Sequence, residues 1–374
     1  MIGGRLMTDR RLQNDVEKLE GGELMLQGHP RSLAGSLYDV VCTIVCRPSS
    51  VVCLSMLMLT VLLSSCFKEK PISPPHIITE SVYVANMGDN YTQQVYFNLQ
   101  SHQFVDSNSK YDYNMAFDCD PATYNVWING ANLSLACRTG KTNFADVTIA
   151  DTTQGWHEEL GSGIPANNAI GVWGSYPSSG RQIYIINCGV DSVGNSLGFK
   201  KMQMGDFVSN SYQVTFCDMD NSNMHTVSVP KKDKKNLVFL SFNNGGVVHD
   251  FEPDNTEWDF LFTQYCVFFG PPNNINYKVT GVLTNPVKTF AYFVDSTSNF
   301  DNIKRADVAE SKFSANQDNI GYDWKRFSGV SYSTQSAYVF IVKSNSRYFK
   351  LRFLDFNNSS GVKGYPKFQY YELL

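Results

Sequence analysis

Five sequence blocks occur twice in this chain in the same order, and this repetition constrains the fold more than any other feature. The first two pairs are offset by about 143 to 145 residues. The pairs are VYFNLQSHQFV (95–105) with VFLSFNNGGVV (238–248), YNMAF (113–117) with WDFLF (258–262), RQIYII (181–186) with AYVFIV (337–342), GFKKMQMGDF (198–207) with YFKLRFLDF (348–356), and YQVTFCDM (212–219) with FQYYELL (368–374). The repetition predicts two tandem units related by internal duplication, residues 80–230 and 231–374.

Both units carry a pattern typical of β-strands. Runs of four to eight residues rich in Val, Ile, Tyr and Phe are separated by Gly, Asn, Asp and Pro. The pair Asn129-Gly130 predicts a hairpin turn, because this dipeptide tolerates the positive φ of a two-residue turn. No segment after residue 66 carries a sustained 3.6-residue apolar stripe. We therefore expect an all-β fold of two antiparallel β-sandwich-like units.

The N-terminal region predicts a lipid anchor. Its apolar run at residues 50–63 has the length of a signal-peptide core and is short for a transmembrane helix. The run ends in Leu63-Ser64-Ser65-Cys66, the pattern of a bacterial lipobox, whose cysteine thiol receives a diacylglycerol. We expect residues 1–65 to be a signal and upstream segment, removed or partly preceding the true translation start. Residues 66–79, rich in Lys and Pro, then form an extended tether that begins at lipidated Cys66.

Charge and motifs exclude several function classes. The chain has 31 basic and 35 acidic side chains, a net charge of −4 at pH 7, so we expect no nucleic-acid binding. It lacks the GxGxxG, GxxxxGK[ST], HExxH and GxSxG patterns of dinucleotide, triphosphate, zinc-protease and hydrolase sites. Since no nucleophile, base and orienting group can be assembled from motifs, we expect a binding protein and not an enzyme.

Metal and disulfide chemistry stay open at this stage. No two histidines after residue 66 have metal-ligand spacing. The run VVHDFEPDN (247–255) offers His249 and three carboxylates to a cation, but such a run is more often a solvated loop between strands. Five cysteines follow Cys66, and they either form disulfides outside the cytoplasm or stay as buried thiols in apolar strands. They are Cys119, Cys137, Cys188, Cys217 and Cys266.

Rings near two tryptophans, Trp156 and Trp324, are the candidate ligand-binding residues, because Tyr and Trp stack well on flat apolar rings. The first candidates are His157, Trp173, Tyr176 and Tyr332. A neutral histidine can ligate iron, although a lone histidine is more often a hydrogen-bonded surface residue. Most of the aromatic side chains must fill the cores, so these assignments are hypotheses.

The C-terminal segment resembles a known family. AYVFIVKSNSRYFKLRFLDFNNSSGVKGYPKFQYYEL (337–373) resembles the C-terminal signature of the HmuY family of haem-capturing lipoproteins, in which a VYVIKT-type strand, a short turn, YYKLQF, a Gly-containing loop and an F-x-Y strand recur. The WDFLF block (258–262) resembles the family's upstream W-D element, and Trp324 its G-W-type pivot. The resemblance covers the second unit well and the first unit weakly.

The resemblance implies an all-β, membrane-anchored protein that holds haem between loops and passes it to a TonB-dependent outer-membrane receptor. It also implies axial His or Met ligands from two loops that flank the pivot. This chain departs from that pattern, because residues 282–323 and 325–339 contain neither His nor Met. Tyr292 and Tyr332 are left as ring candidates there, beside His157 in the first unit. A phenolate can ligate ferric iron when a cation lowers its pKa from about 10.

We therefore predict a lipoprotein that takes haem or a related porphyrin, free or from haemoproteins, and delivers it to such a receptor. The expected location is the outer membrane, on the periplasmic or the cell-surface face. The alternative is a surface glycan-binding or partner-docking lipoprotein without haem, in which exposed rings stack on sugars and duplicated sites raise avidity. The sequence does not define the oligomeric state.

Overall fold

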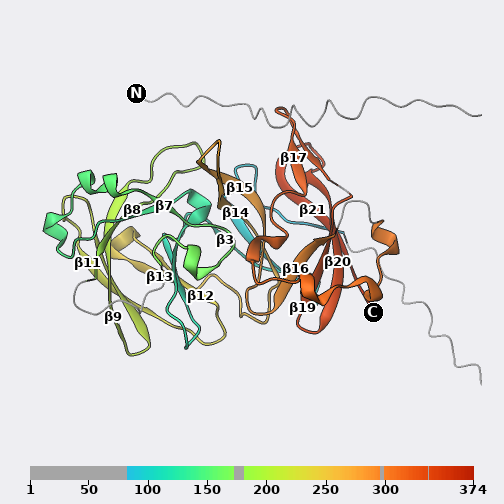
Figure 1. Cartoon of the computed structure of the whole chain (residues 1–374), viewed down its shortest axis with the longest axis horizontal. Coiled ribbons are helices and arrows are strands. Elements are labelled where there is room, and N and C mark those ends of the chain that lie inside the picture. Colours follow the sequence, from blue (N-terminus) through green and yellow to red (C-terminus); the bar gives the residue numbers. More distant parts are fainter. Residues whose placement is uncertain (1–81, 172–180, 295–298, 336) are drawn as a thin grey trace, which may run out of the picture. The chain divides into compact units, whose positions relative to one another are not determined.

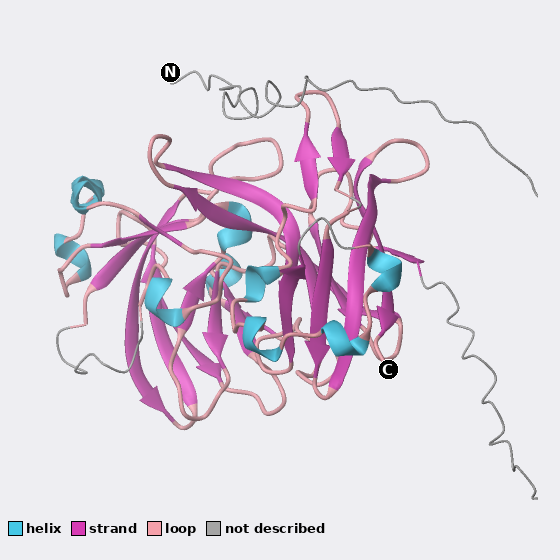
Figure 2. Cartoon of the chain, turned by 45° about the vertical axis from the view of Figure 1, so that its right-hand side comes forward, coloured by secondary structure: helices cyan, strands magenta, loops and turns pink. Residues whose placement is uncertain are grey.

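The computed structural model describes residues 82–171, 181–294, 299–335 and 337–374, and strands dominate them (Figure 1; Figure 2). The predicted all-β fold is confirmed, because the sheets are built from antiparallel strand pairs. The signal and lipobox with Cys66, the tether, and the candidates Trp173 and Tyr176 lie outside the described residues.

The helical elements of the described chain are short 3-10 turns that connect strands. They are η2 (Gly130–Asn132), η3 (Phe144–Asp146), η4 (Ile149–Gln154), η5 (Pro165–Asn167), η6 (Asn243–Gly245), η7 (Phe300–Asn302), η8 (Arg305–Asp307), η9 (Glu310–Lys312) and η10 (Gln317–Asn319). Over the residues that the structure describes, none of the helices is long and apolar enough to cross a membrane.

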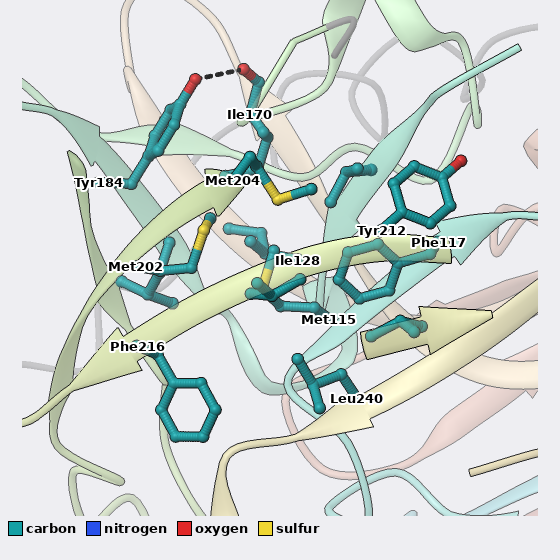
Figure 3. Packing of buried hydrophobic residues seen from close by; sticks show 14 of the residues in the cluster. Met115, Phe117, Ile128, Ile170, Tyr184, Met202, Met204, Tyr212, Phe216 and Leu240 are labelled. Atoms are coloured by element: carbon teal, nitrogen blue, oxygen red, sulfur yellow. Dashed lines mark hydrogen bonds between the residues drawn. The ribbon is translucent and has the colours of Figure 1, made fainter. Parts of the chain in front are cut away.

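The first sandwich packs a six-stranded sheet on a four-stranded sheet. In sheet order the six strands are β11 (His225–Pro230), β10 (Ser211–Cys217), β9 (Phe199–Val208), β8 (Ile183–Asn187), β6 (Leu135–Arg138) and β7 (His157–Glu158). The four strands are β13 (Val247–His249), β12 (Leu237–Ser241), β4 (Met115–Asp118) and β5 (Val126–Ile128). Met115, Met202, Tyr212 and Leu240 gather in the core between them (Figure 3). Since side chains alternate along a strand, Ala116 and Phe239 point away from this core.

The second sandwich has a five-stranded and a four-stranded sheet. The five strands are β1 (Val82–Val84), β21 (Lys363–Glu372), β20 (Arg347–Asn357), β19 (Val339–Ser344) and β16 (Thr289–Val294). The four strands are β15 (Ile275–Thr284), β14 (Phe260–Phe269), β2 (Gln93–Asn98) and β3 (Gln103–Ser109). Phe97, Phe262, Phe353 and Phe368 are buried in its core. A separate hairpin joins β17 (Lys325–Phe327) to β18 (Tyr332–Thr334).

Strand pairing crosses the middle of the sequence in both directions. The hairpin β2–β3 pairs with β14, and the hairpin β12–β13 pairs with β4. Val238 stands opposite Phe117 in one sheet, and Val95 stands opposite Phe262 in the other. Each sandwich therefore contains strands from both sides of residue 231, whereas the predicted units were contiguous in sequence. The duplication itself stays a prediction.

Each of these two hairpins, β2–β3 and β12–β13, donates a backbone N–H to a side chain of the other half of the chain. The Asn114 side chain accepts a hydrogen bond from the Phe242 backbone N–H (2.8 Å), and the Asp259 carboxylate accepts one from the Leu99 N–H (2.8 Å). The buried Asp259 also accepts a hydrogen bond from the hydroxyl of Thr289 (2.8 Å). The aspartate of the W-D element thus links the β2–β3 hairpin to β16.

The five cysteines of the described chain are free, buried thiols. Of the two readings left open by the sequence, the structure has the unpaired one. Burial raises the pKa of Cys188 to about 11 and that of Cys266 to about 12, so both stay protonated and unreactive at neutral pH.

Candidate functional site

The predicted site residues within the described chain lie on three different sheets. His157 is exposed on the edge strand β7, and partial burial together with the charge of Arg138 lowers the pKa of its imidazole. Tyr292 is on β16 of the second sandwich, and Tyr332 is on β18 of the separate hairpin. The Tyr292 ring packs on Phe313 and the Tyr332 ring on Phe327 and Phe356, so the structure places these candidates in different surroundings.

The two predicted tyrosines have structural partners. The Tyr292 hydroxyl accepts a hydrogen bond from the Ala309 N–H (3.0 Å), and its buried ring packs on Phe313 with centroids 4.9 Å apart. The Tyr332 ring packs edge-on against Phe356 at 4.9 Å. The pKa of Tyr332 is raised, mainly because its side chain is partly buried. Both rings hold loops against the second sandwich.

Trp324 anchors the loop that the sequence marked as a pivot. Its side chain is fully buried and stacks on Phe353, with centroids 3.9 Å apart and planes 12° apart. The indole N–H donates a hydrogen bond to the Gly321 carbonyl at 3.0 Å. This fixed tryptophan holds the neighbouring residues in one arrangement.

A cleft of about 540 Å³ lies beside this loop, and we call it the Trp324 cleft. Residues of β16, η10, β17 and the segment before β19 line it. The Phe293 and Tyr338 rings face each other across 4.8 Å at an interplanar angle of 55°. Phe293 is 43% exposed, so part of this aromatic surface is open to a ligand.

Two cations border the same cleft. The Lys325 ammonium is buried, donates a hydrogen bond to the Thr280 carbonyl and lies 4.4 Å from the Trp324 ring centroid. Burial lowers the pKa of Lys325 to about 7. Arg326 is exposed, and its Nη2 lies 3.5 Å from the Tyr338 hydroxyl.

Two tyrosines and two carboxylates, Asp318 and Asp323, also line the cleft, and burial raises the pKa of both carboxyls. Burial, with Asp323 and Asp318 nearby, raises the pKa of Tyr322 to about 12. The buried Tyr265 hydroxyl has no hydrogen-bond partner among the residues of the described ranges. A Cβ at Gly281 would lie 3.1 Å from this hydroxyl and 2.4 Å from the Gly321 carbonyl oxygen, so only glycine leaves room for the tyrosine here. The cleft thus combines aromatic rings, phenol oxygens, a guanidinium, a buried lysine and two carboxyl groups.

The sequence did not single out the residues that make this cleft. Tyr322 directly precedes the Asp323-Trp324 pair, and Tyr338 begins the C-terminal signature, so both had a signal in their neighbours. Phe293 and Arg326 had none, because each is an ordinary outward residue of a strand. Their proximity depends on how β16, β17 and β19 are arranged.

The fold and the cleft define an all-β protein with a ring-lined and cation-bordered cleft. A family model described as HmuY protein matches residues 90–370, which is more than half of the chain. The chain belongs to the HmuY family.

Two solved structures are also similar to the chain. One, from Bacteroides vulgatus, is described as an HmuY-like haem-binding protein; it is 18% identical, has a TM-score of 0.21, and the match covers 46% of this chain and 90% of that one. The other is the apo HmuY analogue of Tannerella forsythia, with 11% identity, a TM-score of 0.22, and coverage of 79% and 96%. No match is found among curated proteins.

Proposed function

We propose that this protein is an outer-membrane lipoprotein that binds haem or a related porphyrin and delivers it to a TonB-dependent receptor. The observation that carries the proposal is membership of the HmuY family over residues 90–370. The Trp324 cleft supports it, because it lies in the part of the chain that carries the family's pivot element.

The residues of the cleft suit the chemistry of a porphyrin. A porphyrin is flat and apolar on its faces and carries anionic propionate groups at one edge. Phe293 and Tyr338 offer ring surface for stacking, and the exposed Arg326 offers a cation to a propionate. A tyrosine oxygen can ligate haem iron, and Arg326 is placed beside the oxygen of Tyr338. We therefore assign the iron to Tyr338 and not to Tyr292 or Tyr332.

Haemin titrated into the purified protein tests this assignment. We expect the Soret band to shift as a complex forms. In Tyr338→Phe, which keeps the ring and removes the oxygen, the complex should have a different Soret maximum and about tenfold weaker affinity. His157→Ala is the matched control and should behave as the wild type, because His157 lies on the other sandwich.

Two outcomes separate the parts of the proposal. A Soret band that stays at the position of free haemin would contradict haem binding and favour the glycan-binding alternative. A complex that forms with an identical spectrum in Tyr338→Phe would leave haem binding in place and remove Tyr338 as the ligand.

The lipid anchor is tested at Cys66. We expect Cys66→Ala to leave the membrane fraction, since several acyl chains on one cysteine give stable anchoring and an unmodified chain has none. Fractionation with immunodetection measures this, with Cys119→Ala as a control that keeps the lipobox. Retention of Cys66→Ala in membranes after a high-salt wash would contradict the anchor.

A further inference from the structure

A second and larger cavity lies between the outward faces of the two four-stranded sheets, with a volume of about 690 Å³. Ala116 and Phe239 line it from the first sandwich, and Tyr96 and Leu261 line it from the second. Their sequence neighbours point into the two cores. The volume falls in the range of small-molecule sites. We call it the inter-sheet cavity.

Aromatic rings from both sandwiches line the inter-sheet cavity. Tyr96 and Trp258 meet edge to face, with centroids 5.2 Å apart and an interplanar angle of 79°. Tyr113 and Phe239 meet similarly at 4.8 Å and 62°. In such a pair, one ring can turn its face and the other its edge toward the cavity. Ring faces attract cations through their quadrupole, most strongly where water is excluded.

A buried carboxylate lies on the same wall. Glu252 is 2% exposed, although its acidic run predicted a solvated loop. Its Oε1 accepts hydrogen bonds from the Asn236 amide (2.6 Å) and the Trp258 indole N–H (2.9 Å), and its Oε2 accepts one from the Leu237 N–H (2.7 Å). A second buried carboxylate, Glu159, lines the cavity elsewhere. The Asn236, Trp258 and Leu237 groups all donate to Glu252, and burial keeps its carboxyl protonated at neutral pH, so a cation that binds beside it takes the place of that proton.

No lysine of the described ranges forms an ion pair with the Glu252 carboxyl. The charge of Lys235 acts on the Glu252 carboxyl and lowers its pKa slightly against the effect of burial. The Lys235 ammonium itself pairs with the carboxylates of Asp254 (3.3 Å) and Asp250 (3.6 Å). Neither Glu252 nor Glu159 forms an ion pair with any residue that the structure describes. On the same wall, the buried Asn236 Oδ1 has no hydrogen-bond partner in the described ranges. Lys232, Lys234 and Lys235 line the cavity as well, and two of them, Lys232 and Lys235, form ion pairs with Asp250 and Asp254. The wall formed by Glu252 and Asn236 therefore offers acceptors and rings to a ligand that brings a donor and a positive charge.

We propose that the inter-sheet cavity binds a small organic cation, an amine or quaternary ammonium group, with Glu252 as its counter-ion and Tyr96 and Trp258 as its ring walls. The proposal goes beyond haem binding, because it concerns a different cavity and a different class of ligand.

Choline and its neutral isostere 3,3-dimethylbutan-1-ol test the proposal by isothermal titration calorimetry of the full protein at about pH 8.5, above the pKa of Glu252. The two probes differ in the charge and little in shape. We expect choline to bind at least about tenfold more tightly than the alcohol, the size of a desolvated cation–ring interaction. Equal affinities, or no binding of choline, would overturn the proposal.

Three variants locate the site. Glu252→Gln should weaken choline binding about tenfold or more, whereas Glu257→Gln, an exposed acid on the same segment outside the cavity, should not. Ala116→Phe fills the cavity without touching the hydrogen bonds of Glu252 and should also abolish binding. Ala116→Phe replaces Glu252→Gln as the test of the site if circular dichroism shows that Glu252→Gln does not fold. Unchanged choline affinity in a folded Ala116→Phe would overturn the proposal.

Tyr338→Phe separates this site from the haem cleft. This variant should keep the wild-type affinity for choline, because Tyr338 does not line the inter-sheet cavity. Loss of choline binding in Tyr338→Phe would mean that the cation occupies the Trp324 cleft, and it would overturn the assignment to the inter-sheet cavity.

Discussion

At the scale of single residues, Glu252 departs most from what its type prefers. Carboxylates are seldom fully buried, and this one lies in a wall of rings and backbone N–H groups. Burial is the main cause that raises its pKa to about 8, against the three donors and Lys235, which lower it. The other titratable groups that sense its charge are Tyr96 and Cys119. The proton on Glu252 is therefore held by the fold.

This proton predicts a pH dependence of stability. In the unfolded chain a glutamate releases its proton near pH 4.3, while folded Glu252 keeps it until about pH 8. Because the folded state binds the extra proton, Glu252 makes the free energy of unfolding fall as pH rises between these values, by up to about 1.4 kcal/mol per pH unit. Glu252→Gln should lose this part of the slope.

Urea unfolding at about pH 5.5, 6.5 and 7.5 measures the slope in both proteins. Glu257→Gln is the control and should follow the wild type, because its side chain is exposed. Parallel profiles for wild type and Glu252→Gln would contradict a raised pKa of Glu252.

At the scale of elements, the Trp324 loop depends on one side chain. Trp324→Ala removes the stack on Phe353 and the hydrogen bond to Gly321, and we expect the free energy of unfolding to fall by about 3 to 5 kcal/mol. Phe327→Ala, on the half-exposed β17, should cost less than about 1 kcal/mol. Urea unfolding measures both. Similar losses in the two variants would show that Trp324 is not the anchor.

Strands could be predicted from this sequence, but the site could not. The short apolar run of β12, the alternation of β20 and the turn residues around them mark strands wherever they pack, so the all-β class follows directly. Exposure of a ring is different, because it depends on what another element covers. The sequence marks Tyr292 as a candidate, but Phe313 covers its ring. Tyr338, which the sequence does not mark, borders the Trp324 cleft. A single sequence holds no signal for which tyrosine the next loop covers.

At the scale of the whole molecule, sequence patterns do not decide which sheet the β2–β3 and β12–β13 hairpins join. The β2 and β12 blocks are both short apolar runs buried on both faces, and their partners β4 and β14 carry similar runs. Either hairpin can therefore satisfy either sheet, and the pairing depends on the connections between elements. The structure pairs each hairpin with the sheet of the other half. Because the two halves of the chain exchange these hairpins, the stability of each sandwich depends on a distant part of the chain.

This dependence predicts which thiol each core variant exposes. Phe97 and Leu240 occupy matched positions of the two hairpins, one in each core. Leu240→Ala should lower the free energy of unfolding by about 2 to 5 kcal/mol and speed labelling of Cys188, which shares its core. Phe97→Ala should instead speed labelling of Cys266 on β14, the strand that pairs with β2. Peptide mapping after pulse labelling with a thiol reagent distinguishes the two sites. If each sandwich were built from a contiguous half of the chain, the two variants would exchange their effects, with Leu240→Ala acting on Cys266.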